Sequence, residues 1–450
     1  MQLKKNNINR YLSLFLITHL IVWTLVPAVT NNNLPLDTIE ALAWGSNLDW
    51  GFNKHPPLSA FFIEIFYQIF GNQDWAYYFL SQIFVVSSFF IVWIFSKEFF
   101  EDLTFRLVSI LLLEGIYFYN FTTPEFNVNV CQLPFWTLSV LYAWKGFKDN
   151  KNLDWLLFGF FAALGVLSKY LFIYLLAAID VFFCYMIIKR KFKFNSLISL
   201  IPFFLVLIPH LIWLVENDYI TISYALHRTG ATNQNFLDHF LYPLIFLTKQ
   251  LGILIPFIGM FLFLLSKIKI KFKFNFKDKK LLFLLCVNIV PIILMFLTSF
   301  TMGVKIRTMW MTPFYLFFGV MFVYYFQKKI NLIKFNKFLT VFLTLFFLSP
   351  IIYGFISISQ TDKRTDYPGK EIAIKVEEKW KNKFTSKIKY VIGDEWTAGN
   401  LSYHLSARPR WLGTKDDVKS KDKLSIVDVY ENNVSEAVSK IGYFKIYGDK

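Results

Sequence analysis

Two acids, a lysine and a histidine lie close together in one polar segment near the start of the chain. Asp37 and Glu40 are three residues apart, so a helix would present both carboxylates on one face. Lys54 and His55 follow, directly before a pair of prolines. A carboxylate in such a set can act as a general base, and a fixed cation beside it can stabilise a developing negative charge. The competing interpretation is a solvated loop in which Asp37 caps a helix.

A third acid, Glu125, lies in a short Thr-Pro-Glu segment between two later apolar runs. The dipole of a helix start favours a carboxylate at such a position, so capping is an alternative role. Because the loop is short and joins two apolar runs, we expect Glu125 to approach Asp37 and Glu40 as a base or orienting group. Asp37 and Glu125 could also hold a divalent ion such as Mg²⁺ or Mn²⁺, which prefers oxygen ligands.

Basic residues accompany these acids in the segments between apolar runs. Lys169 lies in a tight apolar turn, where a lysine either snorkels to the membrane interface or binds an anion. Each of the others, taken alone, fits a contact with a lipid headgroup. Together they could hold a phosphate, because arginine gives bidentate contacts and lysine a point charge. The predicted phosphate-binding set is Lys54, His55, Lys169, Arg228, Lys305 and Arg307.

Several common motifs are absent from the sequence. There is no P-loop, no glycine-rich dinucleotide fingerprint and no His-Glu-x-x-His zinc motif. The six histidines are scattered, and the three cysteines lie in apolar runs, where packing is their expected role. A reaction driven by a bound nucleotide is therefore not supported.

The elements that must position these residues are membrane spans. The 450 residues are 55% hydrophobic and only 17% charged, whereas soluble domains carry about 25% charged residues. A span needs about 20 mainly apolar residues. The first one is also compatible with a signal peptide, but its length and the many later spans favour a retained helix. We predict a mainly α-helical fold with about eleven spans, near 11–29, 77–95, 106–118, 128–144, 153–168, 170–188, 196–214, 247–266, 281–299, 312–326 and 338–357.

The lysine clusters predict how these spans are oriented. They recur between alternate spans and account for the net charge of +16, which is the positive-inside pattern and not a nucleic-acid surface. The N-terminus is then cytoplasmic, and the loops 30–76 and 119–127 lie outside. We therefore predict a membrane domain at 1–357 and a small extracytoplasmic α/β domain at 358–450, since the tail alternates apolar stretches with turn residues.

The motifs, read in order, resemble a known enzyme family. They are Asp-Trp-Gly-Phe-Asn-Lys-His-Pro-Pro-Leu at 49–58, Thr-Pro-Glu at 123–125, Gly-Val-Leu-Ser-Lys-Tyr at 165–170 and His-Leu-Ile-Trp at 210–213. The chain resembles the bacterial glycosyltransferase family 39 and protein-mannosyltransferase-like enzymes. These are integral-membrane glycosyltransferases of the GT-C fold, and lipid A aminoarabinose transferases are their relatives. The tail around 390–400 resembles the outer domain of one bacterial subgroup.

The resemblance implies a hexosyl or pentosyl transferase with a polyprenyl-phosphate sugar donor, undecaprenyl-linked in bacteria. The acceptor it favours is lipid A or lipopolysaccharide at the periplasmic face of the inner membrane, although a glycan, a protein or another lipid would also fit. It maps the first-loop acid onto Asp37 and the second-loop acid, commonly Asp, onto Glu125. It requires no cofactor other than the divalent ion left open above, and it implies inversion at the anomeric carbon.

Two other classes of membrane protein compete with this interpretation. A secondary transporter would place its polar groups mid-membrane on broken helices, whereas most acids here lie in loops. Glu114 and Asp180 are the two mid-span acids that would suit it. A flippase of lipid-linked sugars shares the polyprenyl substrate, so the loop acids discriminate poorly against it.

Overall fold

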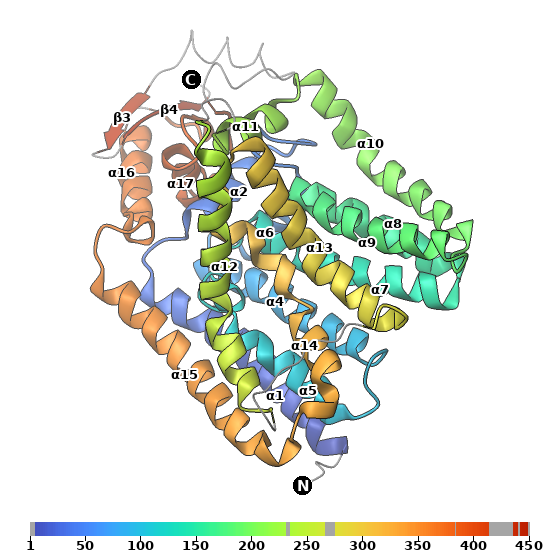
Figure 1. The fold of residues 1–450 in the computed structure, drawn as a ribbon. Coiled ribbons are helices and arrows are strands. Elements are labelled where there is room, and N and C mark those ends of the chain that lie inside the picture. Colours follow the sequence, from blue (N-terminus) through green and yellow to red (C-terminus); the bar gives the residue numbers. More distant parts are fainter. Residues whose placement is uncertain are drawn as a thin grey trace.

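The computed structural model describes residues 5–230, 235–265, 275–382 and 384–413, and the backbone of two further strands at 435–439 and 442–448. Parts of the lysine-rich segment 267–280 and of the predicted C-terminal domain 358–450 therefore lie outside the described residues. The chain is a helical bundle with a small α/β part at one end (Figure 1). This is the predicted fold class.

Within the described residues, seven helices are long and apolar enough to cross a bilayer. Their apolar side chains can face lipid on one side and pack in the bundle on the other. Each helix forms the hydrogen bonds of its own backbone N–H and C=O groups. Three are extended at their start by a 3-10 turn. They are α1 (Lys5–Thr30), α4 (Asp74–Ser96), η3 with α9 (Tyr170–Phe172 and Ile173–Ile188), η4 with α10 (Phe194–Ser199 and Leu200–Glu216), α12 (Asp238–Leu262), α13 (Lys279–Met302) and α15 (Phe335–Ser359), which follows the turn η7 (Leu332–Lys334).

Shorter and broken helices make up the rest of the bundle. The pair η5 (Thr308–Tyr315) and α14 (Phe318–Phe326) is bent by 52°, so it counts as one broken span. Pro313 lies inside η5 and cannot donate to a helical hydrogen bond. With this pair, the described residues hold up to eight candidate spans and not the predicted eleven, because the helices at 106–118, 128–144 and 153–168 are too short or broken to qualify. Each of the eleven predicted ranges still overlaps a helix. The remaining segments are α5 (Leu103–Leu111) with η1 (Leu112–Gly115) and η2 (Tyr117–Tyr119), α6 (Val128–Cys131), α7 (Leu133–Asp149) and α8 (Asn152–Ser168).

Two segments predicted as loops contain helices of their own. The first, 30–76, holds α2 (Leu36–Gly45) and α3 (Leu58–Phe70). The second is the connection 215–246 between the spans predicted at 196–214 and 247–266, and it holds α11 (Ile220–Arg228). α12 also begins at Asp238 instead of near 247. At 9 to 13 residues, α2, α3 and α11 are much shorter than the run of about 20 apolar residues by which a span is recognised.

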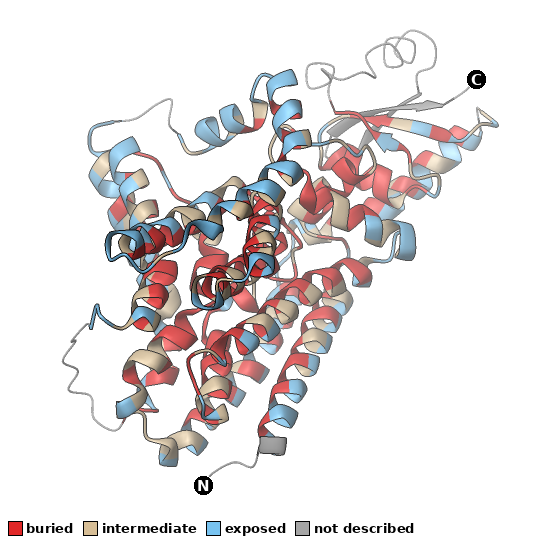
Figure 2. Cartoon of the chain, turned by 90° about the vertical axis from the view of Figure 1, so that its right-hand side faces the viewer, coloured by how far each residue is buried: buried red, intermediate tan, exposed pale blue. Residues whose placement is uncertain are grey.

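Small residues let the helices of the bundle approach closely. A Cβ on Gly159 would lie 1.8 Å from the backbone oxygen of Ser199, and one on Gly319 would lie 1.9 Å from that of Ser109. Such contacts are typical of packing between membrane helices. Many of the buried residues around them are Phe, Trp and Leu. The buried segments lie in the centre of the bundle (Figure 2). The abundant Phe residues are therefore partly core and partly lipid-facing.

The basic loops gather at the end of the bundle that holds the N-terminus. Lys148 Nζ lies 2.7 Å from Glu98 Oε2, so the loops after α4 and α7 meet there. Lys334 Nζ donates to the backbone oxygen of Leu265 at 2.7 Å, which joins the segments before α15 and after α12. The loops with the predicted site residues lie at the opposite end, so the two sets of loops are separated by the bundle.

The C-terminal part packs on that opposite end (Figure 1). It has the turn η8 (Arg364–Asp366), α16 (Gly369–Lys381) and α17 (Thr397–His404) against a four-stranded sheet of order β2-β1-β4-β3. β1 runs parallel to β2 and antiparallel to β4, and β3 and β4 form an antiparallel pair. The strands are β1 (Ile388–Ile392), β2 (Arg410–Trp411), β3 (Ser435–Ser439) and β4 (Gly442–Gly448).

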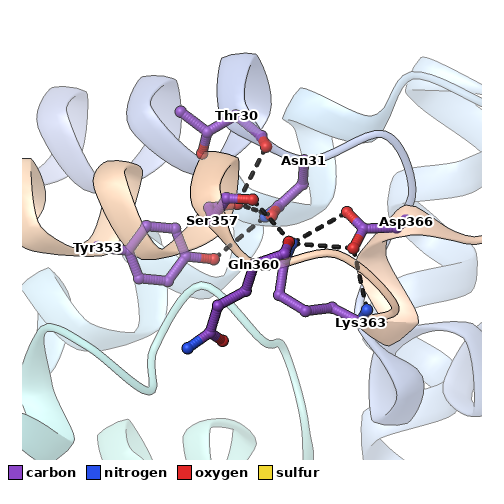
Figure 3. A network of polar contacts seen from close by, with 7 residues as sticks. All are labelled: Thr30, Asn31, Tyr353, Ser357, Gln360, Lys363 and Asp366. Carbon is purple, nitrogen blue, oxygen red and sulfur yellow. Dashed lines mark hydrogen bonds and ion pairs between the residues drawn. The ribbon is translucent and has the colours of Figure 1, made fainter.

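A polar network joins this part to the bundle (Figure 3). The hydroxyl of Ser357, near the end of α15, donates to the backbone oxygen of Thr30 at 2.9 Å, at the end of α1. Lys363 donates to the backbone oxygen of Ser357 at 2.7 Å and pairs with Asp366 at 2.9 Å. The backbone N–H groups of Asn32 and Asn33 both donate to Thr365. The connection between α15 and α16 is therefore fixed to the residues that precede α2.

Candidate functional site

Helix α2 carries the first two predicted acids at the end of the bundle opposite the basic loops. Pro35 precedes it, and Asp37 lies in its first turn, where the helix dipole favours a negative charge. Asp37, Glu40, Ala41 and Trp44 line one narrow cleft, so the helix presents them on one face as the spacing predicted. Thr38 fixes the helix to the next loop by donating to the backbone oxygen of Phe126 at 3.1 Å.

Glu125 meets α2 at its first turn. Its Oε1 accepts a hydrogen bond from the backbone N–H of Asp37 at 3.0 Å. Asn127 follows and lines both the narrow cleft beside Asp37 and a larger cavity of about 260 Å³ beside Glu125. Its side chain also caps α6 by accepting from the N–H of Asn129 at 2.8 Å. The segments that carry Asp37 and Glu125, which are 88 residues apart in the sequence, thus line the same polar site.

Asp37 and Glu125 lie side by side and are half-buried, and their surroundings favour different protonation states. Burial raises the pKa of Asp37, but the charges of four cations oppose this shift. Burial also raises the pKa of Glu125, and the nearby charges of Asp37 and Glu40 raise it further. Asp37 is therefore the carboxylate better suited to be ionised, and Glu125 the one better suited to keep a proton. The cations that act on Asp37 are Lys169, Lys54, Arg307 and Arg228.

Lys54 lies between two carboxylates. Its Nζ is 2.9 Å from Glu40 Oε1 and 3.2 Å from Glu395 Oε1. Burial lowers the pKa of Lys54, but attraction to these acids outweighs that effect and the net pKa is raised. Burial raises the pKa of Glu40 to about 7 in spite of Lys54. Glu395 belongs to the C-terminal part, and no sequence signal linked it to Lys54, because the two are far apart in the chain.

Lys169 is a buried lysine in the turn between α8 and η3. Its Nζ donates to Asn129 Oδ1 at 2.5 Å and lies 5.0 Å from the ring centre of Trp310. Burial lowers the pKa of Lys169 to about 7, against the attraction of Asp37. This lysine faces the protein interior and does not snorkel to an interface. Asn129 was not among the predicted site residues.

His55 lies among aromatic rings and near three cations. Its ring centre is 6.0 Å from that of Trp44 and 6.4 Å from that of Tyr224. Burial, and then the charges of Lys169, Lys54 and Arg228, lower the pKa of His55 to about 3. The imidazole is therefore neutral near pH 7. It can donate a hydrogen bond to a phosphate but brings no charge to it.

The remaining predicted cations lie on the surface around the site. Arg228 ends α11, and Lys305 and Arg307 follow α13; all three side chains are exposed. The backbone N–H of Lys305 donates to Thr229 at 3.2 Å, which joins the two segments. Arg228 and Arg307 are close enough to shift the pKa of Asp37, whereas Lys305 is not among the described cations that do so.

A histidine in α10 fixes the segment that carries Lys54. His210 Nδ1 lies 2.6 Å from the backbone oxygen of Trp50, so this nitrogen must donate. Its Nε2 then accepts from the hydroxyl of Tyr170 at 2.7 Å. A Cβ on Gly51 would lie 2.3 Å from the ring of Trp213, so the backbone approaches that ring closely. Contacts with His210 and Trp213 of α10 therefore fix the start of the segment 49–58.

The acids do not form a preassembled metal site. Among the described residues, no three His, Cys, Asp or Glu side chains converge as metal ligands. One Glu125 oxygen already accepts the Asp37 N–H, and Lys54 occupies Glu40. Four cations act on Asp37, and they would repel a divalent ion. Mg²⁺ is commonly held by one or two carboxylates together with substrate phosphates, so the Mg²⁺ or Mn²⁺ considered for Asp37 and Glu125 stays a prediction.

The mid-span acids that a transporter would use do not line either cavity. Glu114 is enclosed in the bundle, 3.4 Å from His19, and accepts from Asn120 at 3.1 Å. Asp180 is exposed on the outer surface of α9. The larger cavity is lined by Pro35, Phe121, Thr122, Pro124, Glu125, Asn127, Asn129, Val130, Met309, Thr312, Tyr353 and Thr365.

The chain matches one protein family in sequence and is similar to solved structures in fold. Residues 54–213 match the family described as dolichyl-phosphate-mannose-protein mannosyltransferases. The chain superposes on ArnT from Cupriavidus metallidurans bound to undecaprenyl phosphate with a TM-score of 0.63, at 11% identity and with 98% of each chain covered. The apo state of that protein gives 0.62 at 12% identity, again over 98% of each chain. No curated protein sequence matches significantly.

The chain has the GT-C fold. The likeness covers the bundle and the C-terminal part, as the GT-C resemblance of the motifs predicted. Together with the apolar spans, the GT-C fold makes this chain a multi-pass membrane protein. The matched family segment includes Lys54, Glu125 and Lys169, whereas Asp37 and Glu40 precede it.

Proposed function

We propose that this protein transfers a sugar from a polyprenyl-phosphate donor to an acceptor of the bacterial cell envelope. The donor lipid is undecaprenyl phosphate, and the leading acceptor is lipid A or lipopolysaccharide at the periplasmic face of the inner membrane. The observation that carries the proposal is the hydrogen bond from the Asp37 N–H to Glu125, beside four cations whose charges act on Asp37. The solved structure of ArnT with bound undecaprenyl phosphate supports the choice of donor.

The site residues divide the reaction between them. Asp37 takes the proton of the acceptor hydroxyl while the acceptor oxygen bonds to the anomeric carbon. The bond from that carbon to the phosphate oxygen breaks, and its electron pair leaves with the lipid phosphate. Lys54, Lys169, Arg228, Lys305 and Arg307 stabilise this growing negative charge, and neutral His55 donates a hydrogen bond to it.

The other two acids support this transfer. Glu125 accepts the backbone N–H of Asp37 and so orients α2, and Glu40 holds Lys54. A single displacement from the face opposite the phosphate inverts the anomeric carbon. Because the leaving group is already a phosphate, no nucleotide is consumed. The N-terminus is then cytoplasmic and the C-terminal part periplasmic, so a phosphatase fused to the C-terminus is expected to be active outside the inner membrane.

The test compares membrane lipids by mass spectrometry in cells that lack the chain and carry it back as wild type, Asp37→Asn or Asp49→Asn. Asp49 is the matched control, because it lies in the same segment and accepts only the neighbouring N–H of Trp50 among the described hydrogen bonds. We expect one envelope lipid to lose a single sugar mass in the deletion and in Asp37→Asn, and to regain it with Asp49→Asn. General-base catalysis contributes about 10²–10⁴-fold, so the loss is nearly complete.

The outcomes separate the parts of the proposal. If only the deletion loses the sugar, the enzyme class stands but Asp37 is not the base. If no glycolipid, glycan or glycoprotein changes in the deletion, sugar transfer is wrong and the transporter or flippase interpretation gains. The mass of the missing sugar and the lipid that loses it identify donor and acceptor.

A further inference from the structure

The C-terminal part presents one acid from a rigid turn. Asp394 Oδ1 accepts hydrogen bonds from the backbone N–H groups of Trp396 at 2.9 Å and Thr397 at 2.8 Å, at the start of α17. Such bonds satisfy the free N–H groups of a helix start and fix the backbone there. Glu395 lies inside this turn. Its backbone therefore has little freedom, although it belongs to a connection between a strand and a helix.

Glu395 reaches the segment 49–58 at two consecutive residues. Its Oε1 lies 3.2 Å from Lys54 Nζ and accepts from Asn53 Nδ2 at 3.2 Å. The side chains of Glu395 and Lys54 are 13% and 19% exposed, so water competes little for the pair. The C-terminal part thus contributes a charge directly to the site and does more than cover it.

The same part is packed against the helix that carries Asp37. A Cβ on Gly399 would lie 3.0 Å from Ala43 and 3.2 Å from Ile39, so α17 approaches α2 closely. Arg408 donates to the backbone oxygen of Leu42 at 2.7 Å and to Glu64 at 2.9 Å. Glu395 and α2 are therefore fixed relative to each other.

We propose that Glu395 is a positioning residue for Lys54, and that the C-terminal part thereby completes the binding site for the donor phosphate. This inference rests on the proposed function. A free lysine side chain has several rotatable bonds, and ordering it costs conformational entropy. An ammonium group has three donor hydrogens. Glu40 and Glu395 engage two of them, which leaves the third for a phosphate oxygen at a defined place.

The experiment uses the full-length protein in lipid nanodiscs and undecaprenyl phosphate as the probe. Glu395→Gln keeps the shape and removes the charge. Glu377→Gln is the matched control, because Glu377 belongs to the same part and pairs with the exposed Lys381 at 3.1 Å, away from the site. Equilibrium binding of the probe, the KM for the sugar-loaded donor and kcat are measured for both, together with the melting temperature.

We expect Glu395→Gln to weaken probe binding and raise KM by about tenfold, as the loss of one charged hydrogen bond would, with a smaller change in kcat. Glu377→Gln changes neither. Glu395→Asp, which keeps the charge, restores part of the loss. In a Lys54→Met background, Glu395→Gln has no further effect on probe binding, because its role acts through Lys54. An equal effect in that background, or none in the wild type, overturns the inference.

A readout that needs no substrate separates this inference from the proposed function. Hydrogen exchange of the segment 49–58 is compared in the wild type, Glu395→Gln and Glu377→Gln. Faster exchange in Glu395→Gln alone supports the positioning role, and unchanged exchange contradicts it. If the wild type neither binds undecaprenyl phosphate nor transfers sugar, the proposed function fails, and the exchange result alone decides whether Glu395 positions Lys54.

Discussion

Two lysine–glutamate pairs of similar length lie at opposite ends of the bundle. Lys148 and Glu98 are 2.7 Å apart among the basic loops, and Lys54 and Glu40 are 2.9 Å apart in the site. The Lys148 side chain is 50% exposed, whereas that of Lys54 is 19% exposed. Partial burial raises the pKa of Glu98, but the bond from Lys148 prevails and the pKa is lowered. At Glu40 burial prevails, and the pKa rises to about 7.

The difference teaches that the setting of an ion pair, and not its length, decides what the pair can do. Water solvates the outer pair, so both groups stay charged and their bond contributes little to stability. Around Glu40, water is excluded and Asp37 and Glu395 add negative charge, so a proton can stay on the acid near neutral pH. Groups with such shifted pKa values suit binding and proton transfer.

The largest expected effect comes from removing the lysine of each pair. Lys54→Met should lower kcat/KM by about 10²–10³-fold, because it removes a preorganised charge at the leaving phosphate. Lys148→Met should leave transfer unchanged, since an exposed pair is worth under about 1 kcal/mol. Both variants are assayed with the purified protein and a polyprenyl-phosphate sugar. If Lys54→Met and Lys148→Met lowered kcat/KM equally, the proposed functional difference between the two ion pairs would be wrong.

A smaller effect is expected from separating α17 from α2. Gly399→Val places bulk where a Cβ alone would lie 3.0 Å from Ala43, so it should push the C-terminal part away from the site. Overpacking costs about 1–3 kcal/mol, which lowers the equilibrium constant for docking of the C-terminal part by about 5- to 150-fold and should lower transfer with it. Gly259→Val, at a position with open space around it, is the control. Transfer is measured beside the melting temperature, and full activity of Gly399→Val would contradict a supporting role for α17.

The smallest effect concerns the pH dependence of transfer. The pKa of Lys169 is lowered to about 7, so its positive charge is present below that pH and is lost as pH rises through it. kcat/KM, which reports the free enzyme, should therefore fall by up to about fivefold between pH 7 and 8. Lys169→Arg keeps its charge at every accessible pH and should flatten this limb. An alkaline limb that persists in Lys169→Arg belongs to another group.

Apolar runs predicted the bundle well, because a span must be long and apolar whatever surrounds it. Each of the eleven predicted ranges overlaps a helix, and the basic loops meet at one end. The helices α2 and α3 were missed because, at 10 and 13 residues, they are much shorter than the run of about 20 residues that a span requires. The spacing of Asp37 and Glu40 still indicated a shared face, because helical periodicity is a local property.

The sequence by itself determined that the chain lies in a membrane, and which acids and cations flank its spans. Composition and local spacing suffice for both. The short loop of Glu125 already predicted that this acid lies near Asp37, but only the tertiary structure decided which atoms meet. They are the Asp37 N–H with Glu125, Lys169 with Asn129, and Lys54 with Glu395. These contacts join residues 40 to more than 300 positions apart. They depend on how helices pack and where water is excluded, and no local pattern encodes either.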